Sequence, residues 1–447
     1  MRRFLLLFLL VGICTLEGSA RKVYNIDKGW KFYTYDERDT IKVDLPHTWN
    51  ITDALAGHAG YFRGAGNYLK YVHALPEWQG KRVFVRFYGA GNVTDLMVNG
   101  HHAGMHAGGN NAFEFEITNL LNYGGKNLLW VIVNNAPRFD VLPTAGEDNS
   151  YGGLYRSAEI IVTEQAAIGF DGYGGSGILI VPETVDSLHA AGIARIAVNI
   201  PETRSVQLGM TLRDNRDTVV WSGHLRHRAD MGMSVAEMEF DLENPHLWNG
   251  ISDPYLYTVT VTLNDGGRTY TVSFRTGFRK VSVDAATGFY LNDMRYPLRG
   301  VVLWRDQAVY GPTFNEAQLR RDIKIIREMG ANAVRVAGGT HHPAFYDICD
   351  EEGLIVLADG PFIGAASLYE RGYYNTDEFR LNGMLQMQEL IHQHFNNPSV
   401  AFWGVFVEPE LIGDDPLPSI RAMNAMTKEL DPTRLTAAMS TKDGDDH

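Results

Sequence analysis

Short, mostly apolar runs alternate with polar, glycine-rich segments over the first third of the chain. Apolar runs at 83–88, 96–98 and 128–133 predict strands. Asn-Gly and Gly-Gly pairs lie between these runs and mark tight turns. Many short strands separated by glycine-rich turns are typical of a β-sandwich. We therefore expect a jelly-roll domain over residues 22–164.

A second set of short apolar runs follows, and it again has the period of strands. The clearest runs lie at 196–200, 206–212, 219–221 and 255–263. Six or seven strands in about 90 residues fit an immunoglobulin-like sandwich. We expect this second sandwich over residues 186–277.

From about residue 297 the pattern changes to apolar strands that alternate with amphipathic helices. Strands are predicted at 298–303, 332–337, 354–358, 399–406 and 435–439. The spacing of Thr313 and Glu316 predicts a capping box for the first helix, with its apolar face running from Leu319 to Met329. Pro343 is placed to open the second helix. Such βα repeats imply a parallel sheet, either doubly wound or closed into a barrel.

The composition indicates a globular protein and argues against one class of partner. The chain has 447 residues, 45% of them hydrophobic and 21% charged, which is ordinary for a globular protein of several domains. Its net charge of −13 argues against nucleic acid as a partner, because phosphate binding relies on clustered Lys and Arg. Plain solubility accounts for the acidity equally well.

The N-terminus has the pattern of an export signal. Arg2 and Arg3 precede an apolar stretch at 4–14, and small residues follow at 18–20. We expect a signal peptide over residues 1–20 and a periplasmic or secreted protein with no membrane contact after its removal. The alternative is an N-terminal membrane anchor. One of the two cysteines lies in this segment, so Cys349 is left without a disulfide partner and is expected to be an inert buried thiol.

Candidate reactive residues lie at the ends of the predicted parallel strands, where barrel enzymes carry their chemistry. Asp306, Arg335, Asp359 and Glu408 each follow or end such a strand. Glu408 is preceded by eight uncharged residues, so its carboxyl group should be partly desolvated and suited to donate a proton.

Each of these residues also has a structural interpretation. Glu408 would equally fit a surface ion pair at the rim of the sheet. Arg335 would pair with Asp306 or Asp359, because buried charges are normally paired. Trp403 would serve either as a sugar platform or as core packing.

The segment from Asn397 through Trp403 to Glu408 resembles the acid/base strand of glycoside hydrolase family 2, the β-galactosidase, β-glucuronidase and β-mannosidase group. Further segments resemble the family in the family's order, and the resemblance spans about residues 23 to 440. These segments lie at 45–50, 98–109, 152–156, 244–257, 277–279, 298–301, 331–335 and 345–351.

The resemblance implies a fold and an activity. The fold would be a jelly-roll sugar-binding-type domain, an immunoglobulin-like sandwich and a TIM barrel over 278–447. The activity would be hydrolysis of terminal β-glycosidic bonds with retention, which needs two carboxyl groups about 5–5.5 Å apart. Glu408 matches the acid/base, and carbohydrate is the implied partner. Four polar positions and one aromatic position would contact the sugar: Asp306, Arg335, Asp359, Glu147 and Trp403.

The resemblance also predicts what this sequence lacks. The family's nucleophile lies on about the seventh strand, and the sequence ends after the fifth, so we expect about half of a barrel without a nucleophile. Such a barrel has open strand edges, which favour self-association. No cofactor motif is found, and the neighbouring pair His341 and His342 lacks further ligands for a metal.

Some positions depart from the family pattern. Val407 stands where the family has Asn, and Trp304 where it has His. Gly338 occupies the place of a second His, unless a small insertion brings His341 there, and Glu147 replaces an Asp. The alternative function is therefore a catalytically inactive carbohydrate-binding protein or a degenerate member. The sequence leaves the sugar and the linkage open.

Overall fold

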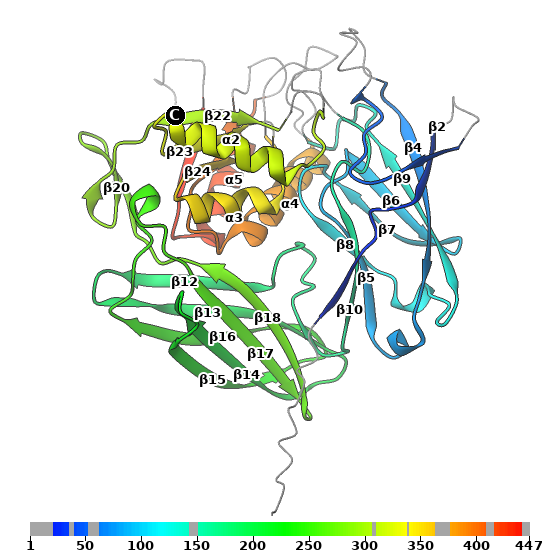
Figure 1. Cartoon of the computed structure of the whole chain (residues 1–447), viewed down its shortest axis with the longest axis horizontal. Coiled ribbons are helices and arrows are strands. Elements are labelled where there is room, and N and C mark those ends of the chain that lie inside the picture. Colours follow the sequence, from blue (N-terminus) through cyan, green and yellow to red (C-terminus); the bar gives the residue numbers. More distant parts are fainter. Residues whose placement is uncertain are drawn as a thin grey trace, which may run out of the picture.

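The structure is a computed structural model, and it describes residues 21–34, 40–51, 62–142, 151–305, 310–337, 339–362, 376–407 and 415–439. The predicted signal peptide lies outside these residues. Two β-sandwiches and a layer of parallel strands with helices make up the described molecule (Figure 1). The predicted combination of a jelly roll, an immunoglobulin-like sandwich and part of a TIM barrel is confirmed.

The first sandwich consists of two antiparallel sheets around an aromatic and aliphatic core. One sheet has the strand order β1, β10, β5, β8, with bounds Lys22–Asn25, Ala158–Thr163, Arg82–Phe87 and Phe113–Glu116. The other has the order β3, β2, β4, β9, β6, β7, with bounds Ile41–Val43, Trp30–Thr34, Ala65–His73, Lys126–Asn134, Val93–Val98 and His101–Ala107. Trp30, Tyr68 and Leu96 are fully buried between the sheets.

The second sandwich is also antiparallel, and its two sheets enclose a separate core. One sheet contains β11, β12, β13 and β16, with bounds Ala167–Ile168, Ile178–Val185, His189–Ile200 and Gly232–Glu243. The other has the order β15, β14, β17, β18, with bounds Val219–Ala229, Arg204–Arg213, Tyr257–Asp265 and Arg268–Thr276. Strands β11 and β12 belong to this sandwich although they precede residue 186.

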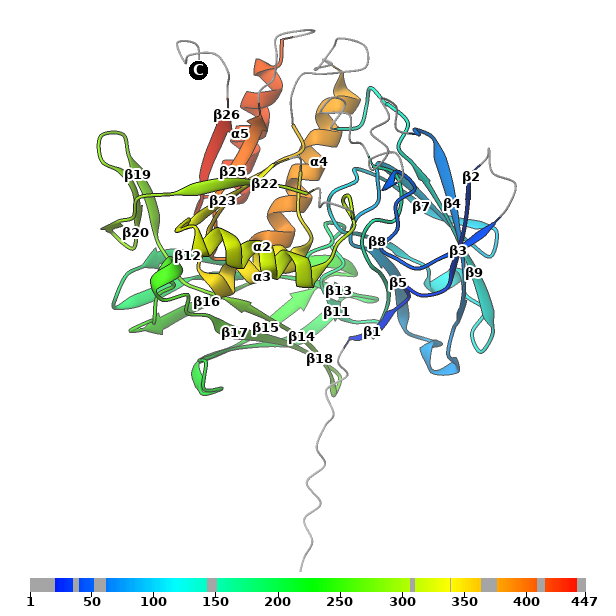
Figure 2. The ribbon, with the colours of Figure 1, turned by 45° about the horizontal axis from the view of Figure 1, so that its top comes forward.

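Five parallel strands follow in the order in which they occur along the chain. They are β22, β23, β24, β25 and β26, with bounds Gly300–Trp304, Ala333–Ala337, Ile355–Asp359, Val400–Val407 and Leu435–Met439. Helices α2, α3, α4 and α5 alternate with them, with bounds Glu316–Glu328, Pro343–Glu352, Asp377–His394 and Leu417–Leu430. Residues from all four helices share one core with the helix-facing side of the sheet. Each new strand pairs with the one before it, and the helices lie on one face of the sheet (Figure 2). This arrangement is that of a barrel wall, whereas a doubly wound sheet reverses its strand order and has helices on both faces.

The inner face of this sheet is covered at its amino end by a small antiparallel sheet. Strands β19, β20 and β21 have the bounds Val281–Asp284, Gly288–Leu291 and Met294–Arg295. Phe289 of β20 packs on Phe402 of β25, with ring centroids 5.5 Å apart. Three short 3-10 helices at Pro76–Trp78, Thr118–Leu120 and Gly250–Ser252 complete the described elements.

The observed helix boundaries agree with most of the predictions made from the sequence and correct two of them. Pro343 does open α3, and the side chain of His342 caps it by accepting from the backbone N–H of Ala344. The predicted cap Thr313 is wrong, because Asn315 caps α2 by accepting from Gln318 N–H. Met329 is 67% exposed beyond the last turn of α2 and does not extend its apolar face. Within the described residues, we find no helix with the length and apolar character needed to cross a membrane.

Helix α4 joins the barrel wall to the first sandwich through a polar stripe. Asn382, Gln386, Glu389 and Gln393 follow one another at helical spacing and face the same side. Asn382 donates to the carbonyl of Ala107 at 2.8 Å, and Gln393 Nε2 donates to the carbonyl of Ala112 at 2.8 Å. Asn111 donates to Glu389 at 3.0 Å and to the carbonyl of Gln386 at 2.7 Å. Buried hydrogen bonds with matched partners fix the orientation of the two units.

Candidate active site

Arg335 and Asp359 meet on the inner face of the parallel sheet, close to its carboxyl edge. Arg335 pairs in register with Leu357, so Asp359 lies on the same face one pleat nearer to that edge. The Nε atom of Arg335 donates to Oδ2 of Asp359 at 2.8 Å. The Arg335 side chain is 20% exposed and that of Asp359 is 1% exposed. The structure therefore brings together two of the predicted site residues.

Asp359 is held against the neighbouring strand at a place where only glycine fits. A Cβ atom added to Gly404 would lie 2.1 Å from Oδ1 of Asp359. Among the described residues, Oδ1 is buried without a hydrogen-bond partner. Burial raises the pKa of Asp359 to about 6, and Arg335 opposes this shift without cancelling it. The buried carboxyl group therefore holds its proton to a higher pH than an ordinary aspartate does.

The edge of the site contains an exposed tryptophan and a contact from the first sandwich. Trp304 ends β22 on the same face as Arg335 and is 48% exposed. The next residue, Arg305, donates to the side-chain oxygen of Asn110 in the loop after β7. Gly339 permits this approach, because its φ is +101° and a Cβ there would lie 2.4 Å from Asn110.

Asn110 was not among the residues predicted from sequence. The preceding glycine pair at 108–109 was the available signal, because glycines often mark a loop that another segment approaches closely. The same loop is anchored by Arg156, which donates to the carbonyls of Asn110 and Thr340. The first sandwich therefore contributes to this side of the candidate site.

Trp403 is core packing, and its interpretation as a sugar platform is wrong. Its side chain has no exposed surface and lies in the core shared with the helices. The indole Nε1 donates to Oδ2 of Asp431 at 2.8 Å, and the guanidinium of Arg434 lies 5.5 Å from the ring centroid. Successive strand residues point to opposite faces, and Trp403 points away from the face that carries Arg335.

The remaining predicted positions divide into described and undescribed residues. Asp306, Glu147, Glu408 and Gly338 lie outside the described residues. Val407 is the last residue of β25, so Glu408 follows directly from a strand of this site.

The structure also places His341, the alternative to Gly338, and its neighbour His342. The ring of His341 stacks on Phe345 with centroids 4.7 Å apart, and burial lowers its pKa to about 3. In the described part of the chain, no three His, Cys, Asp or Glu side chains gather closely enough to hold a metal ion.

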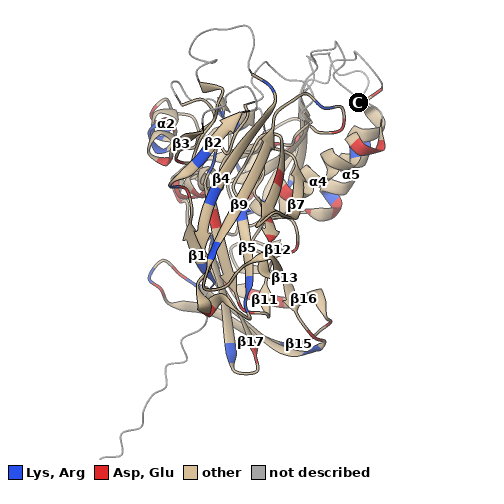
Figure 3. Ribbon diagram, turned by 90° about the vertical axis from the view of Figure 1, so that its right-hand side faces the viewer, with Lys and Arg blue, Asp and Glu red and all other residues tan. Residues whose placement is uncertain are grey.

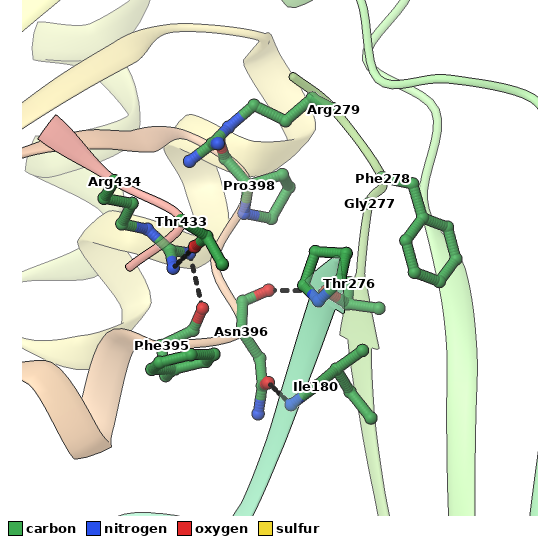
Figure 4. A pocket seen from close by; sticks show the side chains of 11 residues that line it. Ile180, Thr276, Gly277, Phe278, Arg279, Phe395, Asn396, Pro398, Thr433 and Arg434 are labelled. Atoms are coloured by element: carbon green, nitrogen blue, oxygen red, sulfur yellow. Dashed lines mark hydrogen bonds between the residues drawn. The ribbon is translucent and has the colours of Figure 1, made fainter. Parts of the chain in front are cut away.

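The amino end of the same sheet contains a small cavity with two buried arginines (Figure 4). Its volume is about 30 Å³, enough for one or two water molecules. Arg279 donates to the carbonyls of Pro398 at 2.6 Å and of Val400. Arg434 donates to the carbonyls of Phe395 and Val400, and it pairs with Asp431 at 2.8 Å. Arg279 ties the segment after the second sandwich to the chain at the start of β25, and Arg434 ties parts of the barrel wall to one another, so this cavity is a structural joint.

Two family models match this chain, and together they cover most of the second sandwich and the barrel wall. The model of glycosyl hydrolases family 2 matches residues 178–279. The model of the glycosyl hydrolases family 2 TIM barrel domain matches residues 281–445.

Known proteins of this kind are similar along nearly the whole chain. A β-glucuronidase of Bacteroides fragilis is 36% identical over 98% of this chain and 64% of its own length. A β-galactosidase of Thermoanaerobacter pseudethanolicus is 27% identical over 94% of this chain and 56% of its own length. The crystal structure of a Bacteroides uniformis β-glucuronidase superposes with a TM-score of 0.85 at 28% identity, over 94% of this chain and 52% of that one. The chain thus spans about half to two thirds of the length of these relatives.

Proposed function

The chain belongs to glycoside hydrolase family 2, and from this membership we propose that the protein hydrolyses terminal β-glycosidic bonds, with Glu408 as the general acid/base. The observation that carries the proposal is the pair of Arg335 and Asp359 at the carboxyl edge of the parallel strands. Glu408 is the next residue after β25, the strand that pairs with β24 beside Asp359. Enzymes of barrel architecture place their reacting groups there.

The role proposed for Glu408 follows from its surroundings in the chain. Strand β25 is almost entirely buried up to Phe406, and Val407 is partly buried. From this position in the sequence we expect the carboxyl group of Glu408 to be partly desolvated, which would favour its protonated form and allow it to donate to a glycosidic oxygen. Asp359 orients Arg335 and keeps a positive charge beside the place where a sugar would bind. We assign no nucleophile.

An assay on aryl β-glycosides tests the proposal. The panel contains both β-glucuronides and β-galactosides, because the similar proteins are named β-glucuronidase or β-galactosidase. The purified chain is compared with its Glu408→Gln variant, which keeps the size of the side chain and removes the proton. We expect turnover that falls by about 10²–10⁴-fold in the variant, the usual contribution of a general acid. Equal rates for both proteins would contradict catalysis by Glu408.

A non-catalytic sugar-binding role is the second candidate, and exposed Trp304 favours it. An indole that is 48% exposed at the mouth of the sheet offers a face for stacking on a sugar ring. Calorimetric titration with glucuronate, galactose and short β-linked oligosaccharides would test this role. Binding that is lost in Trp304→Ala, together with no turnover by the unaltered chain, would favour this candidate over hydrolysis.

We also propose that the protein is exported to the periplasm or secreted. The pattern of Arg2, Arg3 and the apolar stretch at 4–14 supports this location. Mass spectrometry of the mature N-terminus from the cell envelope and the medium would test it, and a cytoplasmic protein that keeps residues 1–20 would contradict it.

A further inference from the structure

In the second sandwich, one sheet has an outward face that is polar and free of carboxylates. The sheet is formed by β15, β14, β17 and β18, and the register of its strands identifies the side chains that share this face. Three rows cross the whole sheet: Arg226, Gln207, Asn264 and Thr269; His224, Gly209, Thr262 and Thr271; and Ser222, Thr211, Thr260 and Ser273. The two ends of the face are completed by Arg228 and Ser205 and by Arg213, Thr258 and Arg275. All these residues are described, and none of them is Asp or Glu, so we call this area the hydroxyl face.

The acidic residues nearest in sequence lie on the inner side of the sheet or in turns. Asp265 ends β17 on the inward side by strand alternation, and Nε of Arg204 donates to its Oδ1 at 2.7 Å. Asp214 and Asp217 lie in the turn between β14 and β15, where backbone N–H groups donate to the carboxylate of Asp214. Asp230 follows β15 in the next turn. The chain as a whole has a net charge of −13, so a face with Arg and His but no acid differs in sign from the average of the protein.

The hydroxyl face is turned away from the barrel wall. The opposite sheet of the sandwich packs against the helices, because Val181 on β12 belongs to their core and Ile193 on β13 packs on it. The hydroxyl face meets the barrel wall at one corner, where Arg275 pairs with Glu351 of α3. In Figure 3, β15 and β17 lie at the lower end of the molecule, away from α4 and α5. A ligand on this face would therefore leave the candidate active site free.

Strand β15 places three basic side chains in a line along one edge of the hydroxyl face. His224, Arg226 and Arg228 occupy every second position, and all three are exposed. Such positions are about 7 Å apart on a strand, so the line is about 14 Å long. Arg226 and Arg228 form no ion pair with any residue that the structure describes. Their charges are therefore available to an anionic partner.

Short hydroxyl side chains fill the centre of the face and keep it level. Thr260 and Ser273 share a hydrogen bond of 2.9 Å, and Thr262 donates to the carbonyl of Gly209 at 3.4 Å. A Cβ atom added to Gly209 would lie 2.8 Å from Oγ1 of Thr262 and 3.1 Å from Nδ1 of His224, so these two side chains close over the glycine. A hydroxyl group can both donate and accept, so such a surface matches a ligand that is itself rich in hydroxyl groups.

We propose that the hydroxyl face binds an acidic polysaccharide, a sugar polymer that carries carboxylates along its length. The carboxylates pair with Arg226 and Arg228, because the planar fork of a guanidinium group matches the two carboxylate oxygens. The sugar hydroxyls exchange hydrogen bonds with Gln207 and with the Thr and Ser side chains of the three rows. Positive charge and hydroxyl groups on one level face are thus complementary to the two kinds of group that such a polymer presents.

A polymer suits this face better than a single small anion or a membrane does. Each exposed ion pair contributes little by itself, so binding gains from contacts that are repeated along the line on β15. A membrane-binding surface needs large apolar side chains that enter the lipid, whereas the centre of the hydroxyl face has Thr, Ser and Asn. The inference does not rest on hydrolysis at the carboxyl edge of the parallel strands, because the two surfaces are separate.

Calorimetric titration of the full chain with polygalacturonate tests the proposal, and a neutral β-glucan is the uncharged comparison. We expect binding to polygalacturonate and none to the glucan. The double variant Arg226→Gln/Arg228→Gln should bind about five- to tenfold more weakly, because two exposed ion pairs are lost. The matched control is Lys31→Gln/Lys42→Gln, which removes two exposed positive charges from the first sandwich and should leave the affinity unchanged.

A second double variant tests the hydroxyl part of the face. Thr260→Val/Thr262→Val keeps the shape of both side chains and removes their hydroxyl groups, so the affinity for polygalacturonate should fall by about threefold or more. Urea unfolding should show that this variant and the arginine variant are folded. Unchanged affinity in the valine variant would reduce the contact to charge alone and would overturn the proposal.

Other results of these titrations would also overturn the proposal. Equal weakening in the arginine and lysine variants would show that binding follows the net charge of the protein. Equal binding of the neutral glucan would show that the carboxylates are not recognised. The absence of any binding to polygalacturonate at low ionic strength would show that the face is only solvated. Stronger binding to phosphatidylglycerol vesicles that is lost in Met231→Ser, a residue 71% exposed in the turn after β15, would identify a membrane contact instead.

Turnover of aryl β-glycosides by the arginine variant separates this inference from the proposed hydrolysis. The rate should equal that of the unaltered chain, because the hydroxyl face lies apart from the candidate active site. A chain that binds polygalacturonate and turns over no aryl glycoside would contradict the hydrolysis alone. A chain that hydrolyses these glycosides and does not bind polygalacturonate would contradict the present inference alone.

Discussion

The two ends of the parallel sheet use charged residues in opposite ways. At the amino end, Arg279 and Arg434 are almost fully buried, and their donors are taken up by backbone carbonyls and by Asp431. At the carboxyl end, Arg335 is 20% exposed, and Oδ1 of Asp359 is buried without a partner among the described residues. Charged groups at the first end are paired within the fold, whereas the pair at the second end lies at the edge where barrel proteins carry their chemistry.

This difference follows from what each end contacts. The second sandwich presses Arg279 and Thr276 against the chain before β25, so polar groups there must be satisfied within the protein. The carboxyl end faces the loops in which barrel proteins build their active sites. The comparison predicts that substitutions at the amino end change stability, and that substitutions at the carboxyl end change the titration and binding of the site.

The largest effect is expected for Arg434→Ala at the amino end. The variant leaves Asp431 buried without its cation and removes the arginine donor from the carbonyl of Phe395, whereas the carbonyl of Val400 keeps its bond from Arg279. Removing one partner of a buried ion pair costs about 3–5 kcal/mol. Urea unfolding would measure this loss. Arg226→Ala, at an exposed position on β15, is the control and should change the free energy of unfolding by less than about 0.5 kcal/mol.

Trp403→Phe should be the next most damaging change. It removes the hydrogen bond to Asp431 and part of the volume of a fully buried ring, for a cost of about 2–3 kcal/mol. Sugar affinity, measured by calorimetry in the same variant, should not change. A selective loss of affinity with normal stability would restore Trp403 to the binding site.

Gly404→Ala should act on the carboxyl end by displacing Asp359. The new methyl group overlaps Oδ1 of Asp359, so the carboxylate must move and weaken its bond to Arg335, at a cost of about 1–2 kcal/mol. Gly300→Ala on β22 is the control, because a Cβ there has ordinary contacts at 3.5 Å. Equal effects of both substitutions on unfolding would show that the close contact at Gly404 is unimportant.

The smallest expected effect is on the pH dependence of the free energy of unfolding, to which one buried aspartate at each end of the sheet contributes. Burial raises the pKa of Asp359 to about 6 and that of Asp350, at the amino end, to about 7. Both carboxyl groups bind protons more tightly in the folded chain than in the unfolded chain. The free energy of unfolding should therefore fall as pH rises from about 4 to 7, by at most about 1.4 kcal/mol per pH unit for each group.

Substituting each aspartate in turn would show how much it contributes to the change of unfolding free energy with pH. Asp359→Asn should remove the component that is complete near pH 6, and Asp350→Asn the component that extends to about pH 7. Unfolding curves at several pH values would measure both. A slope that is unchanged in either variant, or stability that rises over this range, would contradict the assignment.

Sequence patterns were reliable where one local rule decides the outcome. The change of period along the chain predicted two sandwiches before a parallel sheet, and the strand at 435–439 was placed with its observed bounds. Pro343 predicted the start of α3 because its ring fixes φ for the first helical turn. The cap of α2 was misplaced because Thr313, Asn315 and Glu316 all suit a helix start, and the sequence does not rank them.

The candidate site could be predicted only in part. Arg335 and Asp359 were found because strand ends in a parallel sheet lie at one edge, a rule that needs no knowledge of the loops. The contact of Asn110 with Arg305 joins residues 195 positions apart, and no local pattern reports it. The direction of Trp403 was also undecided, because an apolar strand that is buried on both faces has no polar position to fix its phase.

Strand β9 shows most clearly what the sequence determined and what only the tertiary structure decided. Its sequence from Leu128 to Val133 is wholly apolar, and this run predicted a strand, which the structure confirms. Alternation then assigns every second side chain to the same face, but nothing in an unbroken apolar run says which face is buried. Only the second sheet of the sandwich decided this, by covering Leu129 and Val131 and leaving Trp130 at the surface. The same tertiary packing placed the Arg335–Asp359 pair at the carboxyl end of the barrel wall and buried Arg279 and Arg434 at the amino end.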